Sequence, residues 1–202
     1  MAVITNFGVP ANGNPGTTLM PKLQYRFRVS FELLGDEKST TEVTQNVISA
    51  SRPNLTHEEV VVDSYNSKMY LAGKHTWEPI TVVFRDDMNS NVIKQLGYQL
   101  NKQVDHADQS SAKSGISYKF KTKIETLDGA NGSTTPTTFD MWELQGCFIS
   151  NIQYGDLNYA DSNMVQVTLM IRFDHAEHKL DGAEGENMLG SQTVGTDGEI
   201  VF

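Results

Sequence analysis

The sequence has little of several features that mark familiar classes of protein. Its 202 residues include one cysteine, Cys147, which excludes an internal disulfide and is compatible with a reducing cytoplasm. No apolar run approaches the ~20 residues that a membrane-spanning helix needs, so we expect no membrane association. Lys and Arg number 16 against 25 Asp and Glu, and the net charge of −9 argues against a basic groove that grips nucleic-acid phosphates. Residues 1–21 lack a basic start followed by an apolar stretch, so we expect no secretory signal.

Motifs of catalysis and cofactor binding are also missing. No G-x-S-x-G nucleophile elbow, P-loop or dinucleotide-binding glycine pattern occurs. The strongest metal candidate is the stretch DHAEH, with His175, Glu177 and His178. In a strand the two histidines face opposite ways, whereas in a helical turn they could share one ion. A solvated strand end is the favoured interpretation, so we expect no metal site.

Two acid pairs and the cysteine have simple structural interpretations. Asp86-Asp87 and Glu58-Glu59 could suggest acid–base chemistry, but adjacent residues on a strand face opposite ways. We interpret Asp86-Asp87 as the start of a helix and Cys147 as a small buried hydrophobe. We therefore expect no catalytic residue and no cofactor, and the protein is predicted not to be an enzyme.

Composition divides the chain into three parts. Residues 176–202 carry six acids against one lysine and are rich in glycine, which predicts an acidic extended arm. Residues 1–21 are equally poor in helix or strand pattern and form a predicted N-terminal arm. Between the arms, residues 22–175 form the predicted compact domain.

That domain is mainly β in pattern. Alternation with a period of two predicts strands at 23–33, 116–124 and 165–173, and weaker patterns predict strands at 43–49, 55–62 and 139–152. One amphipathic helix is predicted at about 89–104, with Val92, Ile93, Leu96 and Leu100 on its apolar side. The expected fold is an antiparallel β sandwich or partial barrel with one flanking helix.

The pattern of residues 69–84 predicts a contact with a neighbouring subunit. They read as a hairpin that turns at Ala72-Gly73-Lys74, and its second arm, 80–84, is apolar on both faces. A long isolated hairpin is marginal in water, and its open edge invites pairing. We therefore expect a neighbouring subunit to cover this segment.

Two stretches resemble the tail-tube proteins of contractile-tailed bacteriophages, a family related to type VI secretion tube proteins. In SRPNLTHEEVVVDSYNSKMYLAGKHTWEPITVVFRDDMN, the family's K-x-x-x-A-G pattern is matched by Lys68, Ala72 and Gly73. Thr81-Val82 and Asp87 match the run that leads into its helix. The stretch DMWELQGCFISNIQYGDLNYADSNMVQVTLMIRFDH is similar to the family's closing strands.

The resemblance implies a structural virion protein. Six copies would form a ring whose sheets join into one continuous β barrel, and stacked rings would form the inner tube through which the genome is delivered. It implies as partners further copies of the chain, the tail sheath, and the baseplate or tube initiator, tape measure and tube terminator proteins, with DNA in transit. The protein would be assembled in the bacterial cytoplasm and reside in the virion tail.

Three alternatives stay open. The chain could start or end a tube of this fold, or form the tube of a type VI or extracellular contractile injection system. A ligand-binding β barrel is the distant alternative and would need polar groups that converge on a closed pocket. For a tube that conducts DNA, we expect the lysine row Lys119, Lys121 and Lys123 to face outward or to pair with acids at a subunit boundary, since a positively lined channel would hold DNA.

Overall fold

The computed structural model describes residues 21–35, 40–129, 136–180 and 187–189. Almost all of the predicted arm 1–21 and most of the predicted arm 176–202 lie outside these residues. Within them the chain is mainly β, and its neighbouring strands pair antiparallel. The strands are β1 (Phe27–Glu32), β2 (Val47–Ala50), β3 (Leu55–Ser64), β4 (Ser67–Trp77), β5 (Ile80–Arg85), β6 (Phe120–Leu127), β7 (Thr138–Gln153), β8 (Gln166–Arg172), β9 (His175–Leu180) and β10 (Asn187–Leu189). The helices are α1 (Thr40–Gln45), α2 (Asn91–Gln103) and a 3-10 helix at Gly115–Tyr118.

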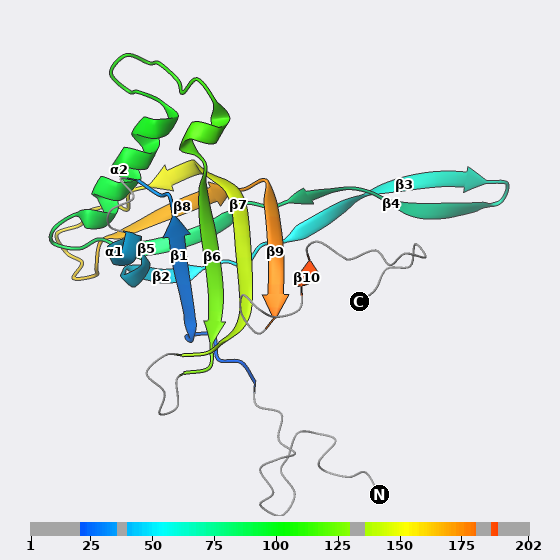
Figure 1. Ribbon diagram of the computed structural model, residues 1–202, viewed down its shortest axis with the longest axis horizontal. Coiled ribbons are helices and arrows are strands. Elements are labelled where there is room, and N and C mark those ends of the chain that lie inside the picture. Colours follow the sequence, from blue (N-terminus) through cyan, green and yellow to red (C-terminus); the bar gives the residue numbers. More distant parts are fainter. Residues whose placement is uncertain (1–20, 36–39, 130–135, 181–186, 190–202) are drawn as a thin grey trace, which may run out of the picture.

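Two layers of strands that cross one another form the body of the molecule (Figure 1). The hydrogen-bonded order is β1-β6-β7-β8-β5-β2, and β7 belongs to both layers: its first half pairs with β6 and β9, its second half with β8. The change of partner falls at Gly146, whose φ of 68° favours glycine. A Cβ at this position would also collide with the carboxylate of Asp174. The bend at Gly146 thus lets one strand carry the sheet from one layer into the other.

Aromatic side chains fill the space between the layers. The ring of Phe31 in β1 lies 5.9 Å from that of Phe84 in β5 and 6.4 Å from that of Phe120 in β6, measured between centroids. Cys147 is fully buried in this core, and its burial raises the pKa of the thiol to about 11. The interpretation of Cys147 as a small buried hydrophobe is therefore confirmed, because almost no thiolate forms at neutral pH.

The helix expected at about 89–104 is α2. Val92 and Leu96 are buried, and Ile93 and Leu100 pack against the same core. The carboxylate of Asp87 accepts a hydrogen bond of 2.7 Å from the backbone N–H of Asn91, the first residue of α2, so Asp87 lies at the helix start as predicted. Asp86 does not contribute to this cap, and its buried Oδ1 has no hydrogen-bond partner among the described residues.

The sequence pattern did not reveal a polar residue on the buried side of α2. Gln99 is fully buried there. Its Oε1 accepts from the backbone N–H of Gly35 at 3.1 Å, and its Nε2 donates to the carbonyl of Tyr118 at 2.5 Å. The side chain thereby links α2 to the turn at Gly35 and to the 3-10 helix at Gly115–Tyr118, and both polar atoms of its amide are hydrogen-bonded.

Several predicted strand boundaries need correction. The strand expected at 43–49 is instead the end of α1 followed by β2, and the strands expected at 23–33 and 116–124 start only at Phe27 and Phe120. The sheet also continues beyond residue 175. β9 pairs along β7, and β10 pairs with β9, so residues 176–180 of the predicted arm belong to the body. Their polar sequence hid this strand, because β9 is held mainly by backbone pairing and Ala176 is its one buried side chain.

The hairpin predicted at 69–84 is wrong. The hairpin in the structure joins β3 to β4 through a turn at Tyr65-Asn66, and β4 and β5 lie in different sheets. Ile80, Val82 and Phe84 of β5 are fully buried in their own chain. These three residues form the buried face of β5, whereas Thr81 and Val83 on its other face are half-buried. Both edges of β5 are hydrogen-bonded within the chain, one to β2 and the other to β8.

The position of α2 predicts the effect of a charge at Leu96. Leu96→Asp places a carboxylate without a partner in the core and should lower the free energy of unfolding by about 3 kcal/mol or more. Asn101→Asp, at an exposed position of the same helix, should change it by about 0.5 kcal/mol or less. Urea denaturation of both variants measures the difference, and an equal effect of the two substitutions would contradict the packing described.

Candidate assembly surface

The hairpin of β3 and β4 projects far from the body of the molecule (Figure 1). Its strands pair only with each other, from Leu55 opposite Trp77 at the base to Ser64 opposite Ser67 at the tip. Apart from Leu55, Gly73 and Trp77, every residue of both strands is exposed. A two-stranded sheet with both faces in water is marginally stable at best, so this segment needs a second layer from elsewhere.

One face of the hairpin is apolar over two successive cross-strand pairs. Val60 lies opposite Leu71, and Val62 lies opposite Met69. Directly opposed residues point to the same side of a sheet, so these four side chains form one surface, called here the apolar hairpin face. Their exposed fractions lie between 38% and 52%. The four residues therefore keep a substantial apolar area in water.

The other face of the hairpin is mixed in character. It carries Glu59 opposite Ala72, Val61 opposite Tyr70, and Asp63 opposite Lys68. Lys68 Nζ lies 3.8 Å from Asp63 Oδ1, in an exposed ion pair that contributes at most about 1 kcal/mol. The hairpin thus has the two-sided pattern of a strand pair that covers something apolar with one face and meets water with the other.

Gly73 lies inside β4 and not in a turn, which corrects the interpretation of Ala72-Gly73-Lys74. The register shifts between the pair His57–His75 and the pair Glu59–Ala72, so β4 holds one extra residue there. A Cβ at Gly73 would lie 2.9 Å from the carbonyl oxygen of Glu58. Glycine at this position therefore lets the two backbones approach at a β-bulge.

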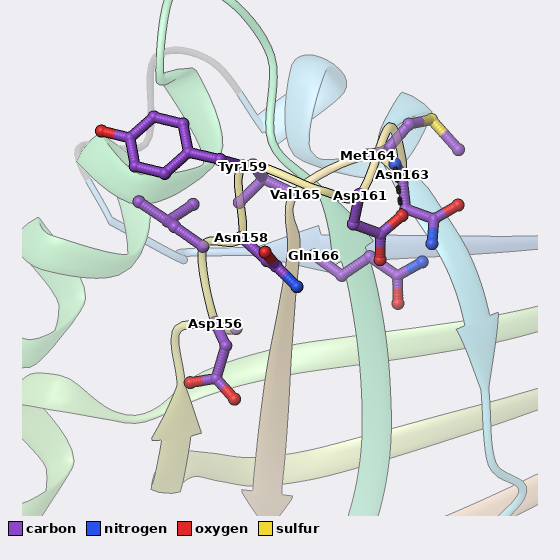
Figure 2. A pocket seen from close by; sticks show the side chains of 10 residues that line it. Asp156, Asn158, Tyr159, Asp161, Asn163, Met164, Val165 and Gln166 are labelled. Atoms are coloured by element: carbon purple, nitrogen blue, oxygen red, sulfur yellow. Dashed lines mark hydrogen bonds between the residues drawn. The ribbon is translucent and has the colours of Figure 1, made fainter.

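A second exposed apolar segment is the loop 154–165 between β7 and β8. Tyr159 is fully exposed, and Leu157 and Met164 are largely exposed. Figure 2 shows the ring of Tyr159 pointing away from Asp161 and Asn163. The Asp161 carboxylate accepts from the backbone N–H of Asn163 at 3.1 Å, so this acid holds a turn.

The hairpin and this loop lie at opposite ends of the molecule. In Figure 1 the loop joins β7 to β8 at the end of the body farthest from the hairpin tip. The hollow beside the loop is open to solvent and lined by consecutive residues, 155–159, 161 and 163–166. It brings no residues from distant elements together, unlike an enclosed ligand site.

Basic residues on β1 and β6 are matched by acids of the same chain. Lys123 pairs with Glu32 at 2.5 Å, Arg28 pairs with Glu125 at 2.6 Å, and Lys121 lies 4.0 Å from Glu143. Hydrogen bonding to Lys123 lowers the pKa of the Glu32 carboxyl.

Lys119 pairs with Asp174. The three lysines thus pair with acids, and these acids belong to the same chain. The predicted place of this pairing at a subunit boundary stays a prediction.

The metal candidates of the sequence do not converge. His175 lies opposite Gln145 and His178 opposite Trp142, on the two faces of β9. His178 contacts the carboxylate of Asp140 and stacks on the Trp142 ring at 4.2 Å. In the described ranges no group of three or more His, Cys, Asp and Glu residues is arranged to hold a metal ion.

Glu58 and Glu59 lie exposed on opposite faces of β3, so they do not act as a pair. Of the helices in the described segments, none is long and apolar enough to cross a membrane.

The bulge predicts that Gly73→Val loosens the hairpin without unfolding the body. The side chain would force β3 and β4 apart, so amide hydrogen exchange in both strands should accelerate while the melting temperature stays nearly constant. Gly97→Ala is the matched control, because a Cβ at Gly97 meets nothing within 4 Å. This substitution should stabilise α2 by about 1 kcal/mol and leave hairpin exchange unchanged. Unchanged exchange in Gly73→Val would refute the role given to Gly73.

The comparisons with known proteins concern the fold. No protein-family profile and no curated protein sequence matches the chain. The structure is similar to a chain of the anti-feeding prophage baseplate, with a TM-score of 0.59 at 15% identity over 82% of this chain and 99% of that one. It is similar to a chain of the sheath-tube complex of the PVC extracellular contractile injection system, with a TM-score of 0.59 at 15% identity over 79% and 92%. A chain of the PVC sheath/tube terminator gives a TM-score of 0.60 at 15% identity over 80% and 98%. The chain has the fold found in these contractile injection particles.

Proposed function

We propose that the protein is a structural subunit of the inner tube of a contractile injection particle. The observation that carries this proposal is the projecting hairpin, whose apolar face nothing in the described part of the chain covers. The shared fold supports it, because the similar chains come from baseplate, sheath-tube and terminator assemblies. The role is mechanical and not enzymatic.

Copies of the chain associate head to tail in this proposal. The hairpin and the exposed loop 154–165 lie at opposite ends and differ in shape, so a contact that uses both is heterologous. Heterologous contacts generate a closed ring when the rotation between copies closes. A ring of six copies is the arrangement that the tail-tube resemblance implies.

Sheet edges provide a second route of association. β1 and β2 end the strand order, so within the described residues each has one edge without a partner. Joining such edges between copies closes a sheet into a barrel and removes the exposed backbone groups. An interface of this kind exceeds the ~1,600 Å² of a standard protein contact.

The finer assignment is a tube of a contractile bacteriophage tail. The partners would then be the tail sheath, the baseplate or tube initiator, the tape measure and the tube terminator, and the location the virion tail after assembly in the host cytoplasm. A tube-end protein is the second candidate, because one of the similar structures is a sheath/tube terminator. A type VI or extracellular injection tube uses the same geometry.

Passage of DNA sets an electrostatic condition on such a tube. The channel must not hold the duplex, since each phosphate neutralised by a lysine or arginine adds to a salt-dependent grip. The pairing of Lys119, Lys121 and Lys123 with Asp174, Glu143 and Glu32 reduces the positive charge of this row, with Glu143 shared between Lys121 and Lys179.

Assembled protein is therefore expected not to bind duplex DNA at physiological salt. Charge-reversed Glu32→Lys should bind it measurably, because it frees Lys123 and adds a further positive charge. Fluorescence anisotropy with a labelled duplex makes the comparison. Tight binding by the native protein would contradict a DNA-conducting channel.

A substitution on the apolar hairpin face tests assembly itself. Val62→Asp places a charge in the proposed contact and should shift the protein from rings or tubes toward monomers in sedimentation velocity, with the melting temperature of the body unchanged. Val61→Asp is the control, since Val61 lies on the opposite face and is also exposed, at 47% against 38% for Val62. Native protein that stays monomeric at high concentration would overturn the proposal, and so would equal assembly by both variants.

A further inference from the structure

The base of the hairpin holds two histidines directly opposite each other. His57 of β3 pairs with His75 of β4, and their ring centroids lie 6.0 Å apart. Both side chains are exposed. No hydrogen bond or ion pair among the described residues engages either ring, so the imidazole nitrogens are available to a ligand.

The alternation of the strands places this pair away from the apolar hairpin face. His57 lies on the same side of β3 as Glu59 and Val61, opposite the side that carries Val60 and Val62. His57 and Glu59 also line one shallow hollow together with Tyr70. A docked neighbour on the apolar hairpin face would leave the histidine pair open to solvent.

Two imidazoles in this arrangement suit a transition-metal ion. Directly opposed residues of an antiparallel pair have Cβ atoms about 5 Å apart, which lets two ring nitrogens reach one ion at about 2.0–2.1 Å. Imidazole favours Zn²⁺, Ni²⁺ and Cu²⁺ over the hard cations Mg²⁺ and Ca²⁺. We propose that His57 and His75 form a two-histidine site for a divalent transition metal.

The protein supplies two ligands to this site, and water supplies the others. The described chain contains no arrangement of three His, Cys, Asp or Glu residues around one point. The Glu59 carboxylate, next along the same face toward the tip, contributes negative charge near the ion. Such a site remains open on its outer side and differs from a closed structural zinc site.

Metal binding would clip β3 to β4 just before the bulge at Gly73. An ion that binds the paired strands and not the separated ones stabilises the pairing by mass action. The ring of His75 meets that of Trp77 edge-on at 6.3 Å, and Trp77 packs on Trp142 and Phe173 in the body. The metal site therefore lies where the hairpin joins the body, and it is close enough to Trp77 for bound Cu²⁺ to change the tryptophan fluorescence.

The test is a titration of the untagged full chain with ZnCl₂ by isothermal calorimetry, and with CuCl₂ by quenching of tryptophan fluorescence. One equivalent of metal per chain should bind, and either His57→Asn or His75→Asn should abolish that step. His106→Asn and His175→Asn change exposed histidines outside the hairpin and should leave it intact. Zn²⁺ should also slow amide exchange in β3 and β4 of the native protein and not in His57→Asn.

Two results would overturn the site. One is the absence of binding at neutral pH, and the other is binding that persists in both His57→Asn and His75→Asn. Circular dichroism establishes that these surface variants are folded. Repeating the titration in Val62→Asp separates the metal site from assembly, because the histidines lie on the other face and the site should survive there even if the proposed function fails.

Discussion

A two-stranded sheet cannot bury its own side chains, and the rest of the account depends on this constraint. β3 and β4 comprise 21 residues, from Leu55 to Ser64 and from Ser67 to Trp77, and no other described strand pairs with them. Val60, Val62, Met69 and Leu71 stay in water on one side of it. Burial of an apolar side chain of this size is worth about 1.5–3 kcal/mol when complete. Burial of the apolar hairpin face against a neighbouring copy therefore contributes favourable free energy to association.

The base of the hairpin packs into the body, although the rest of its length projects away from it. Trp77 at its base is almost fully buried, and its ring lies 5.7 Å from that of Phe173 and 6.4 Å from that of Trp142. The hairpin therefore leaves the body in a direction set by the core. A projecting element with a fixed root can meet a neighbouring copy at little conformational cost. On β1 and β6, the ion pairs Arg28–Glu125 and Lys123–Glu32 neutralise basic side chains of the sheet.

The sequence revealed most of the body and misplaced its most prominent feature. The period-two pattern located β1, β6 and β8, and the apolar positions of α2 predicted its buried side, because both signals come from one face meeting a core. Weaker patterns located β7 and most of β3. The hairpin was misplaced because Ala72-Gly73-Lys74 reads as a turn, although Gly73 serves a bulge. The valine run Val60 to Val62 between Glu59 and Asp63, followed by Tyr65-Asn66, was the available signal. β9 escaped notice because its pairing with a distant strand, from His175 opposite Gln145 to Leu180 opposite Asp140, leaves no local trace in HAEHKL.

The most direct measurement is a cryo-electron microscopy reconstruction of the full chain at high concentration. The account predicts closed rings, alone or stacked into tubes, in which Val60, Val62, Met69 and Leu71 of each copy lie against a neighbouring copy. Monomeric particles, or rings in which the apolar hairpin face still meets only solvent, would contradict it.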